Sequence, residues 1–220
     1  MTICARNVGW ILLAGCSLVG FSHIARADTI FSNFPAAGNF EAICVGGANC
    51  GDQGAANRFT SLLTYDLTEI DLAIANEAGS NSATVELLDS AGITPGSTVL
   101  ESWVTGALPA YTGNPGANTV LTDHAGVVLT AGTDYWVAVL PAQTSAYPFN
   151  DAWFDSQSGP NTAQAEFHGS SWTTIGGSSY AFAVDGTQAG TGTVPEPASL
   201  LLIGTGLAGM ARLLRRRISL

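Results

Sequence analysis

Two carboxylates that flank a tryptophan are the residues best placed for chemistry. Asp151 and Asp155 lie on either side of Trp153, and Trp172 follows in similarly polar surroundings. Paired carboxylates carry out glycoside hydrolysis, and carboxylate oxygens also bind Ca²⁺, although the EF-hand spacing is missing here. Their polar surroundings make Trp153 and Trp172 better candidates for exposure, and hence for glycan contact, than Trp103 or Trp136. The favoured interpretation is that all four tryptophans pack in the core or against loops.

Two histidines could act as general bases, but no motif supports catalysis. His124 follows Asp123, and His168 lies near Glu166, so a serine-histidine-acid arrangement is formally available. The chain has no G-x-S-x-G, H-E-x-x-H or phosphate-loop motif. It also has no lysine, which excludes Schiff-base chemistry. We predict no catalytic residue, no metal site and no cofactor, and hence that the protein is not an enzyme.

Two of the four cysteines fall in the body of the chain. Cys44 and Cys50 are separated by a short segment that contains two glycines. In an oxidising compartment such a pair most often forms a disulfide. Free thiols and metal ligation are the alternatives.

The first 27 residues have the pattern of a secretory signal peptide. Arg6 precedes an apolar run from Val8 to Gly20, and Ala25-Arg26-Ala27 is a small-x-small cleavage site before Asp28. The pattern predicts export through the Sec translocon and cleavage by signal peptidase. An uncleaved anchor is one alternative, and Leu13-Ala14-Gly15-Cys16 resembles a lipoprotein box, which is the other.

The charge distribution separates the two ends from the body. All 17 acidic residues lie between Asp28 and Glu196, and Arg58 is the single basic residue among them. Such an acidic surface repels phosphate, so nucleic-acid binding is excluded. It suits a body that stays soluble outside the cytoplasm, and it is compatible with cation binding.

The C-terminus combines a stiff motif, an apolar run and a basic end. Pro195-Glu196-Pro197 precedes an apolar stretch from Ala198 that continues to Leu214. At 1.5 Å per residue a helix of this length spans roughly 25 Å, enough for a thin bilayer. Basic residues stay on the cytoplasmic side and act as the membrane stop. They are Arg212, Arg215, Arg216 and Arg217.

These features, in this order, resemble the PEP-CTERM sorting signal of Gram-negative bacteria that produce exopolysaccharide. The resemblance covers residues 194–220 and implies that an exosortase in the inner membrane recognises Pro195, Glu196 and Pro197. It implies transit through the inner membrane and delivery to the cell surface or extracellular matrix. We therefore expect three parts: a signal peptide (1–27), an extracytoplasmic domain (28–193) and a sorting signal (194–220).

The body has a hydrophobic period of two, which predicts strands. Within 67–74 the residues Ile70, Leu72 and Ile74 fall on one face of a predicted strand, and Val85 and Leu87 repeat the pattern. Both faces of 135–140 are apolar, which predicts a central strand covered on both sides, and 180–185 is predicted to be a closing strand. Turns rich in Gly, Asn and Pro separate these runs, and the turn at 76–81 is predicted to close a hairpin. We predict an all-β, antiparallel, jelly-roll-like sandwich.

The body also resembles, more weakly, the choice-of-anchor R domain, a surface module joined to various anchoring signals. The resemblance covers residues 30–187 and is carried by the segments Gly96–Trp103 and Leu129–Val139. It implies fold and location but no chemistry. Together these patterns predict a non-enzymatic envelope or matrix protein associated with exopolysaccharide or biofilm. A carbohydrate-binding module is the alternative, and a polysaccharide-acting enzyme is a third hypothesis.

Overall fold

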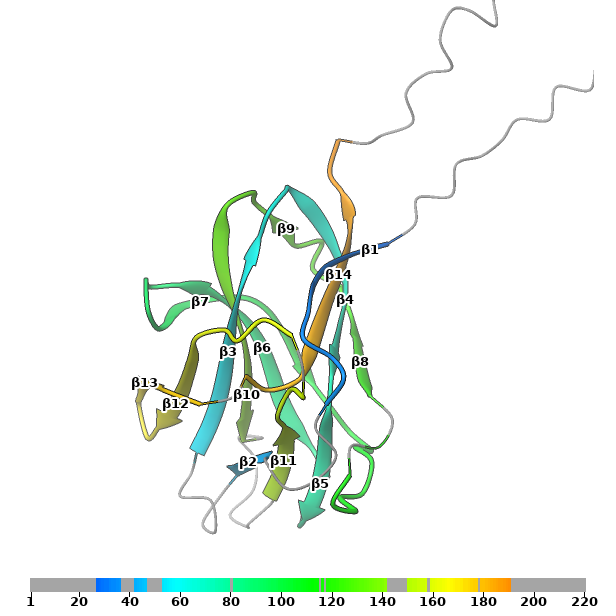
Figure 1. The fold of residues 1–220 in the computed structure, drawn as a ribbon, viewed down its shortest axis with the longest axis vertical. Coiled ribbons are helices and arrows are strands. Elements are labelled where there is room, and N and C mark those ends of the chain that lie inside the picture. Colours follow the sequence, from blue (N-terminus) through cyan, green and yellow to red (C-terminus); the bar gives the residue numbers. More distant parts are fainter. Residues whose placement is uncertain are drawn as a thin grey trace, which may run out of the picture.

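The structure is a computed structural model of the chain, and it describes residues 27–36, 42–46, 53–79, 81–114, 116, 118–141, 150–157, 159–177 and 179–190. Every regular element in these ranges is a β-strand, as the alternating pattern predicts (Figure 1). The predicted signal peptide, apart from Ala27, and the predicted sorting signal lie outside the described residues. The described ranges contain no helix long and apolar enough to cross a membrane.

The described residues form fourteen strands in two sheets, and all pairings between these strands are antiparallel. The smaller sheet has the order β1-β14-β4-β8, with β9 also paired to β4. Its strands are β1 (Asp28–Ser32), β4 (Tyr65–Leu72), β8 (Thr119–Thr122), β9 (Val128–Leu129) and β14 (Phe182–Gln188).

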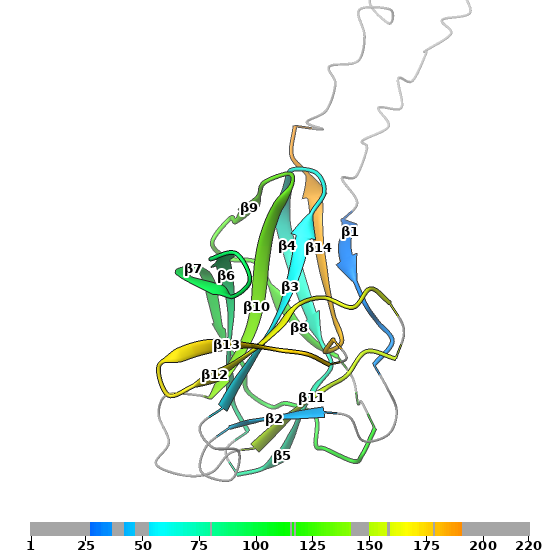
Figure 2. The ribbon, with the colours of Figure 1, turned by 60° about the vertical axis from the view of Figure 1, so that its left-hand side comes forward.

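The larger sheet has the order β5-β11-β2-β3-β10-β6-β7, and the β12–β13 hairpin joins it through β3. Figure 2 shows this hairpin projecting at the side of the molecule. The strands of this sheet are β2 (Ala42–Gly46), β3 (Gln53–Ser61), β5 (Ile74–Ala78), β6 (Ala83–Ser90), β7 (Pro95–Val104), β10 (Thr133–Pro141), β11 (Asn150–Phe154), β12 (Gln164–His168) and β13 (Ser171–Ile175).

One apolar core lies between the two sheets. Phe182 of β14 packs edge-on against Phe59 of β3, with ring centroids 6.2 Å apart, and Phe31 of β1 stacks on Phe182 at 4.7 Å. Aromatic pairs in these geometries add to the free energy gained by burying their area. The smaller sheet therefore supplies one wall of the core and the larger sheet supplies the other.

β10 is the doubly covered central strand that the sequence predicts. Tyr135, Val137 and Val139 face the main core, whereas Trp136 and Ala138 face a second apolar cluster on the other side of the sheet. Both sets are buried because strands β3 and β6 flank β10 and side chains from the β12–β13 region cover its outer face.

The predicted strand over 67–74 is divided between the two sheets. Ile70 and Leu72 belong to β4 in the smaller sheet, and Ile74 opens β5 in the larger one. The chain changes sheet at Ala73, whose N–H and C=O bond to Ala181 and Phe154. All three predicted residues nevertheless face the same core. The predicted turn at 76–81 does not close a hairpin, because β5 pairs with β11 and β6 pairs with β10 and β7.

A buried asparagine fastens the end of β1 to the start of β14. Asn33 donates from Nδ2 to the carbonyl of Tyr180 at 2.8 Å, and its Oδ1 accepts from the N–H of Phe182 at 2.8 Å. Asn57 of β3 donates to the same Tyr180 carbonyl at 2.9 Å. These bonds satisfy backbone groups that would otherwise be buried without partners.

Candidate functional site

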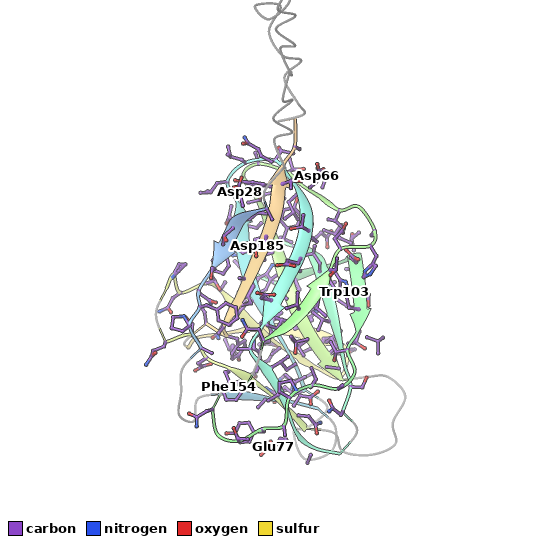
Figure 3. The ribbon with its side chains drawn as sticks, turned by 90° about the vertical axis from the view of Figure 1, so that its right-hand side faces the viewer. Asp28, Asp66, Glu77, Trp103, Phe154 and Asp185 are labelled. Carbon is purple, nitrogen blue, oxygen red and sulfur yellow. The ribbon has the colours of Figure 1, made fainter. Side chains whose placement is uncertain are left out.

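Three carboxylates gather on the outer face of the smaller sheet. Glu69 and Asp71 lie on β4 and Asp185 lies on β14, and Glu69 is the direct cross-strand partner of Asp185. Their carboxylate oxygens lie within 4.8 Å of one another, and all three residues are half-buried. Figure 3 looks onto this sheet and labels Asp185. Alternation places these acids outside because Ile70, Leu72 and Val184 point inward.

Burial and nearby like charges raise the pKa of Asp71. Burial is the largest cause, and the charges of Glu69 and Asp185 add to it. Asp71 Oδ1 is buried and has no hydrogen-bond partner. The cluster can hold a proton, or it can offer oxygen ligands to a hard divalent cation, which would need further ligands from water. The sequence places Glu69 and Asp71 on one face, but pairing with Asp185 depends on a strand order that no local pattern reveals.

Asp151 is fully buried on β11 and does not reach solvent. Its Oδ1 accepts a 3.1 Å hydrogen bond from Nδ2 of Asn76, and its Oδ2 has no partner. Burial raises its pKa to about 7 despite the Asn76 hydrogen bond, which lowers it. A carboxyl in this position cannot touch a polysaccharide, so the predicted pairing of Asp151 with Asp155 does not provide a sugar site.

A second acid pair lies under the loop that follows β8. Glu101 of β7 is buried, and its Oε1 accepts a 2.7 Å hydrogen bond from the N–H of His124. Burial and a hydrogen bond to the Asp123 carboxyl raise the pKa of Glu101, and the His124 N–H lowers it. The imidazole of His124 is exposed, with Nδ1 3.7 Å from Glu101 Oε1. Asp123 accepts from the N–H groups of Gly126 and Val127, which closes the loop.

The other histidine also has an acidic partner. His168 Nε2 lies 3.2 Å from Glu166 Oε2 at the exposed end of β12. Within the described part of the chain, no serine hydroxyl bonds to His124 or His168. Each histidine therefore has the acid that a triad needs but lacks the nucleophile next to it.

The structure corrects the predicted exposure of one tryptophan. Trp153 is fully buried: its Nε1 donates to the carbonyl of Ala181 at 3.0 Å and its ring packs on Tyr180 at 5.1 Å. The prediction that Trp153 is more exposed than Trp103 or Trp136 is wrong, because Trp153 faces the main core although its neighbours in sequence are polar. Trp172 is half-buried on β13, where it packs on Phe167 at 5.1 Å, and remains available for contact.

The predicted processing and disulfide residues mostly fall outside the described ranges. Pro195, Glu196, Pro197, the four terminal arginines, Ala25 and Cys50 are among them. Ala27 is exposed directly before β1, so the predicted first residue of the mature chain, Asp28, is also the first residue of a strand. The backbone of Cys44 pairs with Ala152 in β11. The disulfide stays a prediction.

A hollow of about 590 Å³ opens beside the segment that follows β1. Phe34, Pro35, Ala36, Gly116 and Asn118 line it. Phe34 and Ala36 also pack against a third apolar cluster, so one side of the hollow is anchored to the fold. Its walls are mainly apolar, with the Asn118 amide as a polar group.

Comparison with known proteins identifies the C-terminal segment. Residues 193–217 match the PEP-CTERM protein-sorting motif. The chain is therefore an exported protein that an exosortase sorts and that is membrane-anchored in transit through its C-terminal region. No curated protein matches the chain.

Proposed function

We propose that this protein is a non-enzymatic component of the bacterial envelope or extracellular matrix, delivered by exosortase sorting and associated with exopolysaccharide or biofilm. The match of residues 193–217 to the sorting motif carries the proposal. The acidic body is compatible with it, because net negative charge keeps a secreted domain soluble. The resemblance of the body to the choice-of-anchor R domain, and a jelly-roll strand order, belong to the same proposal.

The chemistry of the described acids supports a role in structure or binding over one in catalysis. Asp151 is fully buried and Glu101 nearly so, which leaves neither carboxyl open to a polymer substrate. A general acid must come within hydrogen-bond reach of the bond that it protonates. Their raised pKa values are therefore explained by burial in the fold.

Intact-mass measurement of the protein tests the sorting proposal. We expect a product that begins at Asp28 and ends near Pro195 in cells with the exosortase, and a longer product in cells without it. Glu196→Ala should give the longer product in both backgrounds. The matched control is Glu77→Ala, which removes an exposed acid from the body and should leave processing unchanged. A tail that keeps Arg215 to Arg217 in both backgrounds would refute exosortase processing.

Carbohydrate binding is the second candidate function, and Trp172 favours it. This half-buried indole lies on the projecting β12–β13 hairpin (Figure 2). Extracted polysaccharide should quench tryptophan fluorescence, and Trp172→Phe should abolish the quenching. Trp153→Phe is the control, because its buried ring cannot contact a sugar. Release of reducing ends from the polysaccharide would instead support the enzyme hypothesis.

A further inference from the structure

Three large apolar side chains are exposed at one end of the sandwich. Leu62 and Leu63 form the β3–β4 turn and are 78% and 46% exposed, and Val128 of β9 is 52% exposed. We call these three residues the apical apolar surface. β9 pairs with the first residues of β4, so Val128 lies opposite Asp66 and close to the turn. Figures 1 and 2 both show β9 and the β3–β4 turn at the same end.

The turn has a fixed structure. Ser61 donates from Oγ to the carbonyl of Leu63 at 2.7 Å, and the N–H of Gly132 donates to the carbonyl of Ser61 at 2.7 Å. The N–H of Ala131 donates to Thr64 Oγ1 at 3.3 Å. These hydrogen bonds fix the backbone of the turn in a conformation that leaves the side chains of Leu62 and Leu63 exposed.

The C-terminal end of the body lies beside this surface. The last residues of β14 pair with the first residues of β4, and the N–H of Ala189 donates to the carbonyl of Thr64 at 2.9 Å. Both β14 and the start of β1 reach this end of the molecule (Figure 1). Gly190 is the last residue that the structure describes, and the apolar run that we predict to span the membrane begins at Ala198.

The intervening chain is short, and its length limits how far this end can lie from the membrane. The chain from Gly190 to Ala198 can span at most about 29 Å when fully extended. While the tail is in the membrane, Gly190 is therefore held within that distance of Ala198. The bond from Ala189 to Thr64 places the apical apolar surface beside this tether. Leucine and valine side chains that enter the interfacial region are removed from water, which favours contact.

We propose that the apical apolar surface docks on the outer face of the lipid bilayer while the protein is tethered by its tail. The occupant is lipid rather than a second copy, because the short tether keeps this end of the body close to the membrane. The exposed acids Asp28 and Asp66 lie at the same end (Figure 3). Arg58, the one basic residue of the body, pairs with Asp134. Docking is therefore apolar and weakened by anionic lipid.

Photo-crosslinking of the full chain tests this proposal, which rests on the membrane-tethered tail of the proposed function. Benzoylphenylalanine is introduced at Leu62 and, as a matched control, at Val104. Val104 is 74% exposed and lies at the end of the molecule away from the β3–β4 turn. In exosortase-deficient cells we expect lipid adducts at position 62 several-fold above position 104. In reconstituted vesicles, replacing phosphatidylethanolamine by phosphatidylglycerol should lower the yield at position 62.

The other outcomes are distinguishable. A chain absent from the membrane fraction would overturn the proposal together with the tethered tail on which it rests. A membrane-bound chain with equal lipid adducts at positions 62 and 104, or with none, would overturn docking and leave sorting intact. Adducts of position 62 with a protein alone would also overturn lipid docking and would identify this end as a protein contact.

Discussion

Asn76 donates a hydrogen bond from Nδ2 to Oδ1 of Asp151 at 3.1 Å, between neighbouring strands β5 and β11. Among the described residues, this amide is the group that bonds to the carboxyl, and Oδ2 of the buried acid has no hydrogen-bond partner. A single neutral donor does not replace the water that an ionised carboxylate loses on burial. The pair therefore holds a proton in the interior of the fold near neutral pH.

Asp151→Asn should remove the part of the pH dependence of stability that this carboxyl contributes. The folded-state pKa of about 7 exceeds the ordinary aspartate pKa of 3.8, so the folded state binds the proton more tightly and stability falls as pH rises from about 4 to about 7. At pH 9 the ionised acid costs on the order of 4 kcal/mol, and the unpaired amide of the variant costs about 1–3 kcal/mol. Urea unfolding should show the variant more stable at pH 9 and no more stable at pH 5.

Asp66→Asn is the control for that series, because it removes an exposed acid near the end of the sandwich. Its unfolding midpoints should follow those of the parent protein at both pH values. Equal slopes of stability against pH for Asp151→Asn and the parent would show that the buried carboxyl does not titrate in this range.

Glu101→Gln should preserve stability, whereas Glu101→Ala should reduce it. Glutamine keeps an oxygen that accepts from the N–H of His124. Its amide also supplies a donor toward the Asp123 carboxylate, whereas in the native protein the Glu101–Asp123 hydrogen bond needs one of the two carboxyls to be protonated. Alanine leaves the His124 N–H without this acceptor, at a cost of about 1–3 kcal/mol. The raised pKa of Glu101 means that parent stability falls as pH rises above 4.5, and the glutamine variant should lose this part of the slope. Thermal unfolding at pH 5 and pH 8 measures both effects.

The strands were more predictable than their arrangement. A period of two identifies β4 and β6, because one face of each enters the core, and an apolar run on both faces identifies β10, which is buried on both sides. It cannot identify the change of sheet at Ala73, since Ile70, Leu72 and Ile74 all face one core from two sheets. The alternation indicates which side chains of a strand are buried, but it does not indicate which other strand pairs with it.

The acids and tryptophans show where local composition fails. Asp151 and Asp155 made the surroundings of Trp153 look polar, yet Asp151 is itself buried on the same strand. The outer-face cluster forms because Asp185, from the last strand, pairs with Glu69 of β4. Their separation in sequence hides the contact. Both cases depend on long-range strand pairing, which a single sequence does not report.

Asp71→Asn should stabilise the protein at neutral pH when divalent cations are removed with EDTA. The substitution relieves burial of a charge and repulsion from Glu69 and Asp185, the causes that raise the pKa of Asp71. The group is partly exposed, so solvent screening limits the gain to roughly 0.5 kcal/mol. The gain should vanish near pH 3, where the native acid is protonated, and should shrink in high salt. A loss of stability at pH 7 would instead indicate that the Asp71 carboxylate makes a favourable contact.

Reduction of the predicted Cys44–Cys50 disulfide should lower stability. A ring this small restricts the unfolded chain modestly, and its loss costs about 2 kcal/mol by the loop-entropy relation. Cys44 lies on β2, whose backbone pairs with β11. Loss of the disulfide should therefore also weaken the pairing of β2 with β11, the strand that carries Asp151. A thiol assay on the unfolded, unreduced mature protein should detect no free thiol, and dithiothreitol should lower the melting temperature. The Cys44→Ala/Cys50→Ala double variant is the control, because it should not respond to the reductant. Two free thiols in the unreduced protein would rule out the disulfide.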